Sequence, residues 1–434
     1  MSDPLEKILI KGGRILDPAS NRDEVGDLLV EDGLIRELGP SIKAPNACKT
    51  IDAKGKLVVP GLIDLHTHLR EPGFEYKETV ATATAAAAWG GFTTVCCMPN
   101  TKPVNDNQSV TEFILEKAKE EGIVHVLPVG AITKGSKGEE LAEMAELVAA
   151  GCVAVSDDGL PVMNSQVMRQ AMNYAKIFDV PVIDHCEDLN LTADGVMFEG
   201  EVSTALGLRG IPASSETVMV ARDIELAELT GARVHLAHIS TAGSVALIRD
   251  AKRRGVRVTA ETCPHYFTLT DEAVRGYNSN AKMKPPLGAQ RDQMAIRAGL
   301  ADGTLEVIAT DHAPHAADEK EQELDCAPFG IVGLETALPL SLRLVDEGVL
   351  SLMEAIRKLT AGPAAVLGKK TGRFEIGDRA DISIIDPEAE WTVKAQSFKS
   401  LGKNSPFIGW TMKGRATAVI VAGKLIENEL HGST

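Results

Sequence analysis

The chain has 434 residues, enough to bury a large core and to divide into one large and one small domain. Its formal net charge of −16 argues against a nucleic-acid or acidic-membrane surface, and no apolar segment is long enough to span a bilayer. Residues 1–11 lack the basic and apolar regions of a secretory signal, and the seven cysteines form no paired motif. We therefore expect a reduced, cytoplasmic protein.

The two ends of the chain share one pattern. Residues 6–58 alternate apolar and polar side chains between glycine-rich turns, and the tail does the same at Arg379–Asp386 and Ala416–Ile426. Both patterns predict short antiparallel strands. We expect the two ends to pair into one small composite β-sandwich, residues 1–60 with 369–434, beside a domain of residues 61–368.

The middle of the chain repeats a single unit. Eight short apolar runs end in polar residues, and a stretch of helical composition usually follows each run. Buried strands that alternate with helices indicate a parallel sheet. Eight units predict a (β/α)8 barrel with its active site at the C-terminal strand ends, and a large open doubly wound sheet is the alternative. The predicted strands are Leu62–His68, Phe92–Asn100, His125–Thr133, Cys152–Asp158, Val180–Glu187, Arg233–Ser240, Val256–Thr262 and Leu305–Asp311.

The helices predicted between and after these strands complete the eight units. The alanine-rich segment 81–88 is the strongest helix former among them. The predicted helices are Thr79–Trp89, Ser109–Glu121, Glu139–Ala150, Ser165–Phe178, Ser215–Thr230, Gly243–Arg254, Asp292–Ala301 and Gly333–Asp346.

His66 and His68 form the most informative local pattern. They stand two residues apart at the end of the first barrel strand, so both imidazoles point to the same side. Two converging imidazoles can grip a divalent metal. Arg70 lies on that side too if the strand continues, where its guanidinium suits a carboxylate ligand; a salt bridge to Glu71 or Glu75 is the alternative.

Metal-ligating residue types recur at the other strand ends. Four histidines and two carboxylates exceed what one tetrahedral zinc requires, and they fit two metals with a bridging group. Adjacent Asp157 and Asp158 cannot both point inward, and Asp311 could ligate, carry a proton or cap a helix. The residues at this rim are Asp64, His66, His68, Arg70, Asn100, Asp157, Asp158, His185, Glu187, His238, Asp311, His312 and His315. His125, His235 and His431 are expected to be structural or exposed, with His235 on the strand face opposite His238.

Several motifs resemble family signatures. Asp64–Gly73 (DLHTHLREPG) and Ala309–His315 (ATDHAPH) are both similar to dihydroorotase motifs. Four shorter segments are similar to the family as well, namely Met98–Thr101, Ser156–Gly159, Glu261–His265 and Gly330–Glu335, and all six motifs occur in family order along the chain. The chain thus resembles the type I bacterial dihydroorotases of the amidohydrolase superfamily, whose fold is a (β/α)8 barrel with a composite β-sandwich.

The resemblance implies two zinc ions per subunit. His66 and His68 would hold one zinc together with Asp311, which would also carry the catalytic proton. His185 and His238 would hold the second. Many relatives bridge the two metals with a carboxylated lysine on strand four. Segment 151–160 contains no lysine here, and Asp158 occupies the bridging position.

The resemblance also implies how the substrate is bound. Arg70, Asn100 and His315 would bind its exocyclic carboxylate, and Gly330 is expected at the same site. The family often shows Asn-Pro-Pro-Leu-Arg after strand seven, with the asparagine touching substrate. This chain reads Lys284-Pro285-Pro286-Leu287-Gly288, so Lys284 could donate a charged hydrogen bond or point to solvent. Segment 318–328 resembles a mobile loop, and His265 is expected to be structural.

The implied activity is that of a dihydroorotase, the reversible zinc-dependent cyclisation of N-carbamoyl-L-aspartate to L-dihydroorotate in de novo pyrimidine biosynthesis. One alternative is another cyclic amidohydrolase of the hydantoinase or allantoinase type, which generally carries the strand-four lysine. The second is a non-catalytic dihydroorotase-like partner of aspartate transcarbamoylase, which typically lacks metal ligands. We expect a homo-oligomer, with aspartate transcarbamoylase as a candidate partner and with no nucleic-acid or membrane partner.

Overall fold

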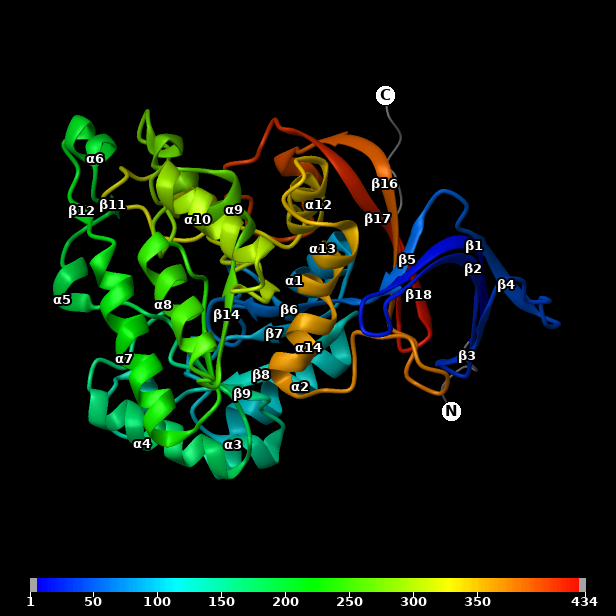
Figure 1. The fold of residues 1–434 in the computed structure, drawn as a ribbon, viewed down its shortest axis with the longest axis horizontal. Coiled ribbons are helices and arrows are strands. Elements are labelled where there is room, and N and C mark those ends of the chain that lie inside the picture. The colour runs from blue at the N-terminus through cyan, green and yellow to red at the C-terminus, as the bar shows by residue number, and fades with distance from the viewer. Residues whose placement is uncertain (1–5, 429–434) are drawn as a thin grey trace.

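The computed structural model describes residues 6–428, so the outermost residues of the predicted terminal sheet, and with them His431, lie outside the described part. None of the helices between residues 6 and 428 combines the length and the apolar character that a bilayer span needs. Figure 1 shows a barrel surrounded by helices and, at its side, a curved sheet built from strands of both chain ends.

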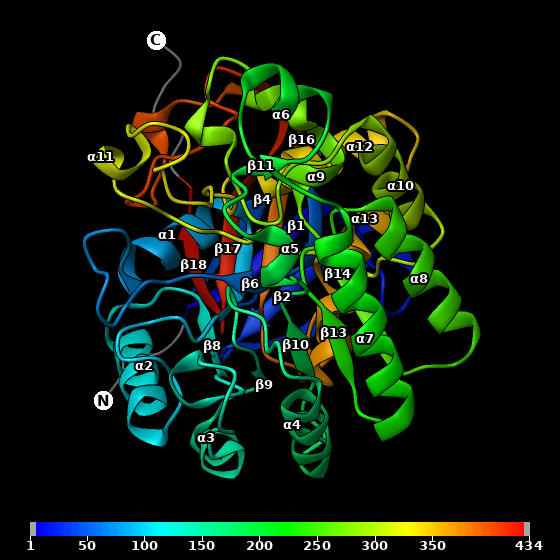
Figure 2. The same ribbon diagram turned by 90° about the vertical axis from the view of Figure 1, so that its left-hand side faces the viewer.

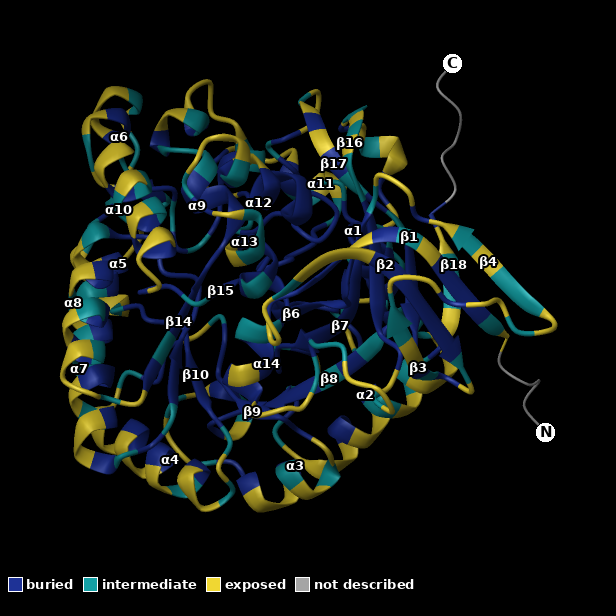
Figure 3. Ribbon diagram, turned by 45° about the vertical axis from the view of Figure 1, so that its right-hand side comes forward, coloured by how far each residue is buried: buried dark blue, intermediate teal, exposed yellow. Residues whose placement is uncertain are grey.

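The eight predicted barrel strands are all present. They form one parallel sheet in the order β15-β14-β13-β10-β9-β8-β7-β6, and nearly every strand residue is buried (Figure 3). The near closure of this sheet confirms the (β/α)8 prediction over the open sheet. The strands are β6 (Leu62–Thr67), β7 (Phe92–Cys97), β8 (His125–Gly130), β9 (Ala154–Val155), β10 (Val182–Asp184), β13 (Val234–Leu236), β14 (Val258–Thr262) and β15 (Val307–Ile308).

Asp64 fastens the first barrel strand to the last. Its Oδ1 accepts hydrogen bonds from the backbone N–H groups of Thr310 and His66, both at 3.1 Å, and its Oδ2 accepts from the Thr310 hydroxyl. The only β-type pairing at this seam, within residues 6–428, is the bridge between Thr67 and His312. The Asp64 carboxylate therefore supplies much of the hydrogen bonding that closes the barrel.

The outer helices begin and end close to the predicted residues. Side chains of Thr79, Asn107, Asn164 and Thr241 accept hydrogen bonds from the first turns of four of these helices. The helices are α1 (Val80–Gly90), α2 (Gln108–Glu121), α3 (Met144–Ala150), α4 (Ser165–Ile177), α7 (Ser214–Thr230), α8 (Ala242–Arg253), α10 (Gln290–Ala301) and α12 (Ala337–Asp346).

Helix α3 is shorter than predicted. The expected start was residue 139, but the helix begins at Met144. Leu141 pairs with Thr133 in an isolated bridge, and the N–H of Ala142 donates to the carbonyl of Ile132. These bonds hold the segment extended against the loop after β8, which outweighs its helical composition.

Short elements that the sequence did not predict lie mostly after strand ends. In Figure 2 three of them, α5, β11 and α6, stand at the front of the barrel. The additional elements are α5 (Leu189–Thr192), β11 (Met197–Phe198), α6 (Glu201–Leu206), β12 (Gly210–Ile211), α9 (Pro264–Thr268), α11 (Ala317–Lys320), α13 (Leu352–Leu359) and α14 (Ala361–Leu367).

The terminal sheet joins both chain ends, as predicted. Its strand order is β18-β17-β16-β5-β1-β2-β3, with β4 also paired to β1. Pairing is antiparallel except that β1 runs parallel to β4 and β5, because residues 40–47 carry the chain back across the sheet. The strands are β1 (Lys7–Asp17), β2 (Arg22–Glu31), β3 (Leu34–Gly39), β4 (Cys48–Asp52), β5 (Leu57–Pro60), β16 (Ile382–Thr392), β17 (Thr411–Val421) and β18 (Lys424–Glu427).

The sheet has its own core, to which both ends contribute, including Ile10, Leu28, Ile384 and Ile420. The chain passes from sheet to barrel at Gly61, where an added Cβ would lie 2.0 Å from the Thr93 hydroxyl oxygen. Only glycine fits so close a crossing. The exact domain limits at 60/61 and 368/369 stay predictions.

Replacing Asp64 with alanine is expected to destabilise the barrel. The change leaves two buried N–H groups and a hydroxyl without an acceptor, which should lower the free energy of unfolding by about 2–4 kcal/mol. Chemical denaturation of both proteins measures the difference. The control is Asp194→Ala, which removes an ion pair with Arg209 whose side chains are 81% and 73% exposed and should change stability by under about 1 kcal/mol. Equal losses in both variants would contradict the closure role of Asp64.

Candidate active site

The six predicted metal ligands come together at the C-terminal ends of five barrel strands. His66 and His68 end β6, and the others follow β9, β10, β13 and β15. All six are at most 6% exposed. The residues are His66, His68, Asp158, His185, His238 and Asp311.

The first group of ligand atoms surrounds one point. His66 Nε2 lies 3.1 Å from Asp158 Oδ2 and 3.6 Å from Asp311 Oδ1. His68 Nε2 lies 3.5 Å and 3.0 Å from the same two oxygens. Two imidazole nitrogens and two carboxylate oxygens thus form one compact cradle.

The second group uses the other oxygen of Asp158. His185 Nδ1 lies 2.8 Å from His238 Nε2, and Asp158 Oδ1 lies 3.4 Å and 3.3 Å from these two nitrogens. The Asp158 carboxylate therefore spans both groups, with one oxygen in each.

These residues fit a divalent metal. Metal–nitrogen bonds of about 2.0–2.1 Å at tetrahedral angles place ligand atoms about 3.3 Å apart, close to the separations observed here. His66 Nε2 is buried and has no hydrogen-bond partner within residues 6–428, as expected of an atom reserved for a metal. His66, His68 and Asp311 form one potential metal group, and His66, Asp158 and His238 form another.

The electrostatics of the site favour positive charge. Burial raises the pKa of Asp158 and Asp311, but the facing histidines outweigh it and hold both pKa values below the usual range. Burial conversely lowers the pKa of His185, yet Asp158 and Glu187 raise it to about 9. The two carboxylates stay anionic and attract either protons on the imidazoles or metal ions.

Three of the four histidines are held by their outer ring nitrogens. His66 Nδ1 lies 2.9 Å from Glu261 Oε1, and His68 Nδ1 lies 2.9 Å from Asn100 Oδ1. His185 Nε2 lies 3.0 Å from Glu187 Oε2. Such partners fix the ring and its tautomer, so the inner nitrogen faces the ligand group.

Glu261 is the site residue that the sequence analysis missed. It sits within the Glu261–His265 motif, but nothing in its spacing indicated that it reaches His66 from β14. Its other oxygen lies 3.1 Å from His235 Nε2. The expectation that His235 faces away from the site is therefore wrong, because the ring joins the same buried network.

The predicted substrate residues share one pocket with the ligands. Arg70, Asn100, Lys284, His315 and Gly330 line it, together with Phe329 and four of the ligands. Arg70 Nε donates to the Pro314 carbonyl at 3.2 Å, which leaves the terminal guanidinium nitrogens for a ligand. Burial lowers the pKa of Arg70 to about 10, so the side chain keeps its charge at neutral pH.

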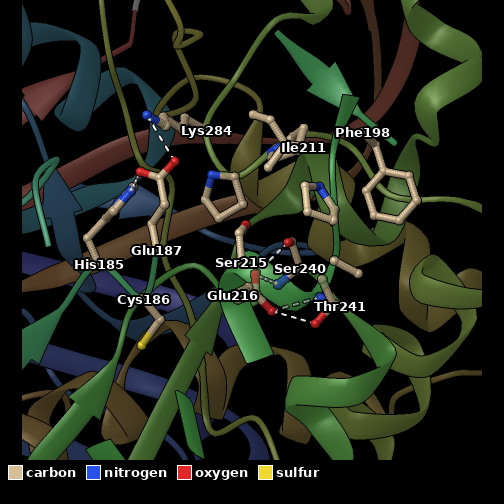
Figure 4. A pocket seen from close by; sticks show the side chains of 14 residues that line it. His185, Cys186, Glu187, Phe198, Ile211, Ser215, Glu216, Ser240, Thr241 and Lys284 are labelled. Carbon is tan, nitrogen blue, oxygen red and sulfur yellow. Dashed lines mark hydrogen bonds and ion pairs between the residues drawn. The ribbon is translucent and has the colours of Figure 1, made fainter. Parts of the chain in front are cut away.

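Lys284 neither points to solvent nor stands alone. Its Nζ lies 3.0 Å from Glu187 Oε1, so Glu187 bridges Lys284 and His185 (Figure 4). Through Glu187, the Lys284 ammonium is therefore linked to His185, a ligand of the second group.

His315 and Asn100 are partly engaged by the protein itself. His315 Nε2 donates to the Phe329 carbonyl at 2.7 Å, and its Nδ1 lies 3.3 Å from Lys77 Nζ. Burial, with the charges of Arg70 and Lys77, lowers the pKa of His315 to about 2, so the ring is neutral. Asn100 gives its oxygen to His68, which leaves its amide nitrogen for a ligand.

Other rim residues have structural partners instead. Asp157 accepts from the backbone N–H groups of Ile132 and Thr133, so Asp158 is the aspartate that faces the ligands. The His312 ring contacts Glu78 and the N–H of Gly333. These contacts anchor the loops that follow β8, β9 and β15.

Three site residues have a strained backbone. Arg70, His238 and Asp311 have φ values of 63°, 35° and 48°, in the left-handed region that non-glycine residues rarely adopt. Each residue turns sharply at a strand end. The surrounding hydrogen bonds hold these conformations, as is common at functional sites.

The family model and the sequence relatives point to one family. A family model described as Dihydro-orotase-like matches residues 55–244. The dihydroorotases of Geotalea daltonii and Geobacter metallireducens are 59% and 58% identical over 419 residues, which cover 96% of this chain and 99% of each relative.

Solved structures show the same fold. An L-hydantoinase (dihydropyrimidinase) from Arthrobacter aurescens superposes with a TM-score of 0.88 at 24% identity, over 98% of this chain and 96% of that one. A D-hydantoinase (dihydropyrimidinase) from Thermus sp. gives 0.83 at 26% identity, over 96% and 94%.

Replacing Glu261 with glutamine is expected to weaken metal binding. The amide removes the negative charge that orients His66, so affinity for zinc should fall about 10- to 100-fold. Competition with a chelator of known affinity measures the change. Glu272→Gln, at the exposed position of a short 3-10 helix (Asp271–Val274), is the matched control. Unchanged affinity in the Glu261 variant would show that His66 needs no such partner.

Proposed function

This chain belongs to the dihydroorotase family, and we propose that its six converging ligands hold two zinc ions at the site where L-dihydroorotate and N-carbamoyl-L-aspartate interconvert. The protein is a cyclic amide hydrolase. In the hydrolytic direction it opens a six-membered ring amide, and in the biosynthetic direction it closes that ring.

The observation that supports two metals is the position of the Asp158 carboxylate, with one oxygen in each ligand group. A divalent metal ion held there supplies Lewis-acid polarisation of the amide carbonyl and activates water near neutral pH. Nitrogen and carboxylate ligands suit zinc. Because segment 151–160 contains no lysine, we assign the chain to the type I group.

Asp311 is the proposed proton carrier. Its Oδ1 faces His66 and His68, and its side chain lines the substrate pocket. With its Oδ1 turned to the two histidines, its Oδ2 is left to accept the proton of the attacking water. Asp311 then delivers that proton to the ring nitrogen as the C–N bond breaks. Ring closure uses the same groups in reverse.

Arg70 is the proposed anchor for the exocyclic carboxylate. Its terminal nitrogens can bind both carboxylate oxygens, and the Asn100 amide nitrogen can add a third hydrogen bond. Lys284 adds positive charge to the same pocket. His315 already bonds to the Phe329 carbonyl, so we propose that it mainly supports the pocket wall, and that it contacts substrate only if that bond is exchanged.

A specific observation argues against each alternative function. A hydantoinase or allantoinase has no need of a half-buried arginine in the pocket for a substrate carboxylate, and such enzymes generally carry the strand-four lysine. A non-catalytic partner of aspartate transcarbamoylase would have no reason to keep six buried ligands at these separations.

We also propose a cytoplasmic location, a homo-oligomeric state and an association with aspartate transcarbamoylase. All seven cysteines are free, as expected in a reducing compartment. The other two proposals rest on the family resemblance alone. Light scattering of the purified chain, with and without the transcarbamoylase, tests both.

The purified, zinc-loaded chain is expected to open L-dihydroorotate, and chelator treatment should abolish the reaction until zinc is restored. Loss of dihydroorotate absorbance measures turnover, and metal content is determined on the same samples. Dihydrouracil, which has the ring but no carboxylate, serves as the comparison substrate. Absence of turnover in protein with measured metal would contradict the catalytic proposal and favour the scaffold alternative.

Replacing Arg70 with glutamine should lower kcat/KM for L-dihydroorotate by about a hundredfold or more, because a charged pair with the substrate carboxylate is lost. The same change should affect dihydrouracil turnover far less. Steady-state kinetics on both substrates measure this contrast. Equal losses on both would mean that Arg70 does not recognise the carboxylate.

A further inference from the structure

Two buried lysines outside the ligand set connect the loops that wall the substrate pocket. Lys282 and Lys320 are only 3% and 5% exposed, and neither forms a salt bridge with any residue between 6 and 428. A buried lysine without a carboxylate partner is costly, so its contacts need an explanation.

Lys320 Nζ donates to three backbone carbonyls. They belong to Pro328 at 2.9 Å, Gly330 at 3.1 Å and Lys282 at 3.3 Å. Three acceptors match the three N–H groups of an ammonium. The planar fork of an arginine would not suit this arrangement.

Lys282 makes the reciprocal connection. Its Nζ donates to the carbonyls of Leu324 at 2.6 Å and Asp325 at 3.2 Å, and lies 4.4 Å from the centre of the Phe329 ring. The Gly330 N–H donates back to the Lys282 carbonyl at 3.0 Å. Each lysine thus binds the backbone of the loop that carries the other.

The two connected segments both line the proposed substrate pocket. Lys284 lies two residues beyond Lys282, and Phe329 and Gly330 belong to the turn held by Lys320; all three line the pocket. The Phe329 carbonyl also accepts the hydrogen bond from His315. Movement of either segment would change the width of the pocket and the position of His315.

We propose that Lys282 and Lys320 are positioning residues, whose ammonium groups lock the Lys282–Lys284 segment and the Pro328–Gly330 turn into one wall of the substrate pocket. The expected effect on kinetics rests on the proposed function. The expected effect on the loop rests on the geometry alone. These contacts connect segment 318–328, whose mobility stays a prediction, to the Lys282–Lys284 segment.

The test compares Lys320→Met with Lys370→Met, the same change at an exposed lysine. Methionine keeps the apolar stem but cannot donate to the three carbonyls. Hydrogen exchange of peptides covering 321–330 should become at least about tenfold faster in the Lys320 variant, because the charged hydrogen bonds are lost. Exchange in β6 and β13 should stay unchanged, and Lys370→Met should match the parent throughout.

Kinetics separate positioning from general stability. The KM for L-dihydroorotate should rise about tenfold in Lys320→Met while kcat changes by less than about threefold, because the lysine touches the pocket wall and not the metal ligands. Equal loss of kcat and metal content would indicate a purely structural role and overturn the proposal. Unchanged exchange in 321–330 would overturn it as well.

A second variant protects the test against misfolding. Lys282→Met removes the bonds to Leu324 and Asp325 and the contact of the ammonium with the Phe329 ring, but leaves the three bonds of Lys320 in place. Faster exchange should therefore concentrate at residues 324–325, with a smaller rise in KM. If the parent chain fails to turn over dihydroorotate, the proposed function falls, while the exchange experiment still decides whether the lysines hold the loop.

Discussion

The buried carboxylate of Asp158 is the constraint on which the active site depends. A negative charge is costly in a site this buried unless positive partners surround it. Here four imidazoles approach from β6, β10 and β13, and each carboxylate oxygen serves a different pair. The Asp158 side chain thereby sets the distance between the two ligand groups. Each strand that carries a ligand must therefore end close to Asp158.

The support around this carboxylate explains how the barrel meets that demand. Glu261, Asn100 and Glu187 hold the outer nitrogens of three histidines, while Asp64 closes the seam beside His66. The left-handed conformations of His238 and Asp311 turn the chain sharply where each strand ends. The same hydrogen bonds therefore stabilise the barrel and position the ligands. The lysine–carbonyl contacts of Lys282 and Lys320 hold the wall of the pocket in addition.

The sequence predicted the features that follow a local period. Apolar runs alternating with helices indicated the eight strands, and two-residue spacing placed His66 and His68 on one side. Contacts between distant strands carry no such period, so the link from His66 to Glu261 stayed hidden. The hydrogen bonds of His315 and the three carbonyls around Lys320 could not be predicted for the same reason. The choice between Asp157 and Asp158 likewise depended on which of the two carboxylates accepts hydrogen bonds from the loop N–H groups of Ile132 and Thr133.

Anomalous diffraction at the zinc edge from crystals of the zinc-loaded chain tests the central claim most directly. The account predicts two zinc peaks, one among His66, His68 and Asp311 and the other beside His185 and His238, with the Asp158 carboxylate bound to both at about 2.0–2.2 Å. A single peak, or two peaks of which Asp158 binds only one, would contradict the bridging role from which the rest of the site has been argued.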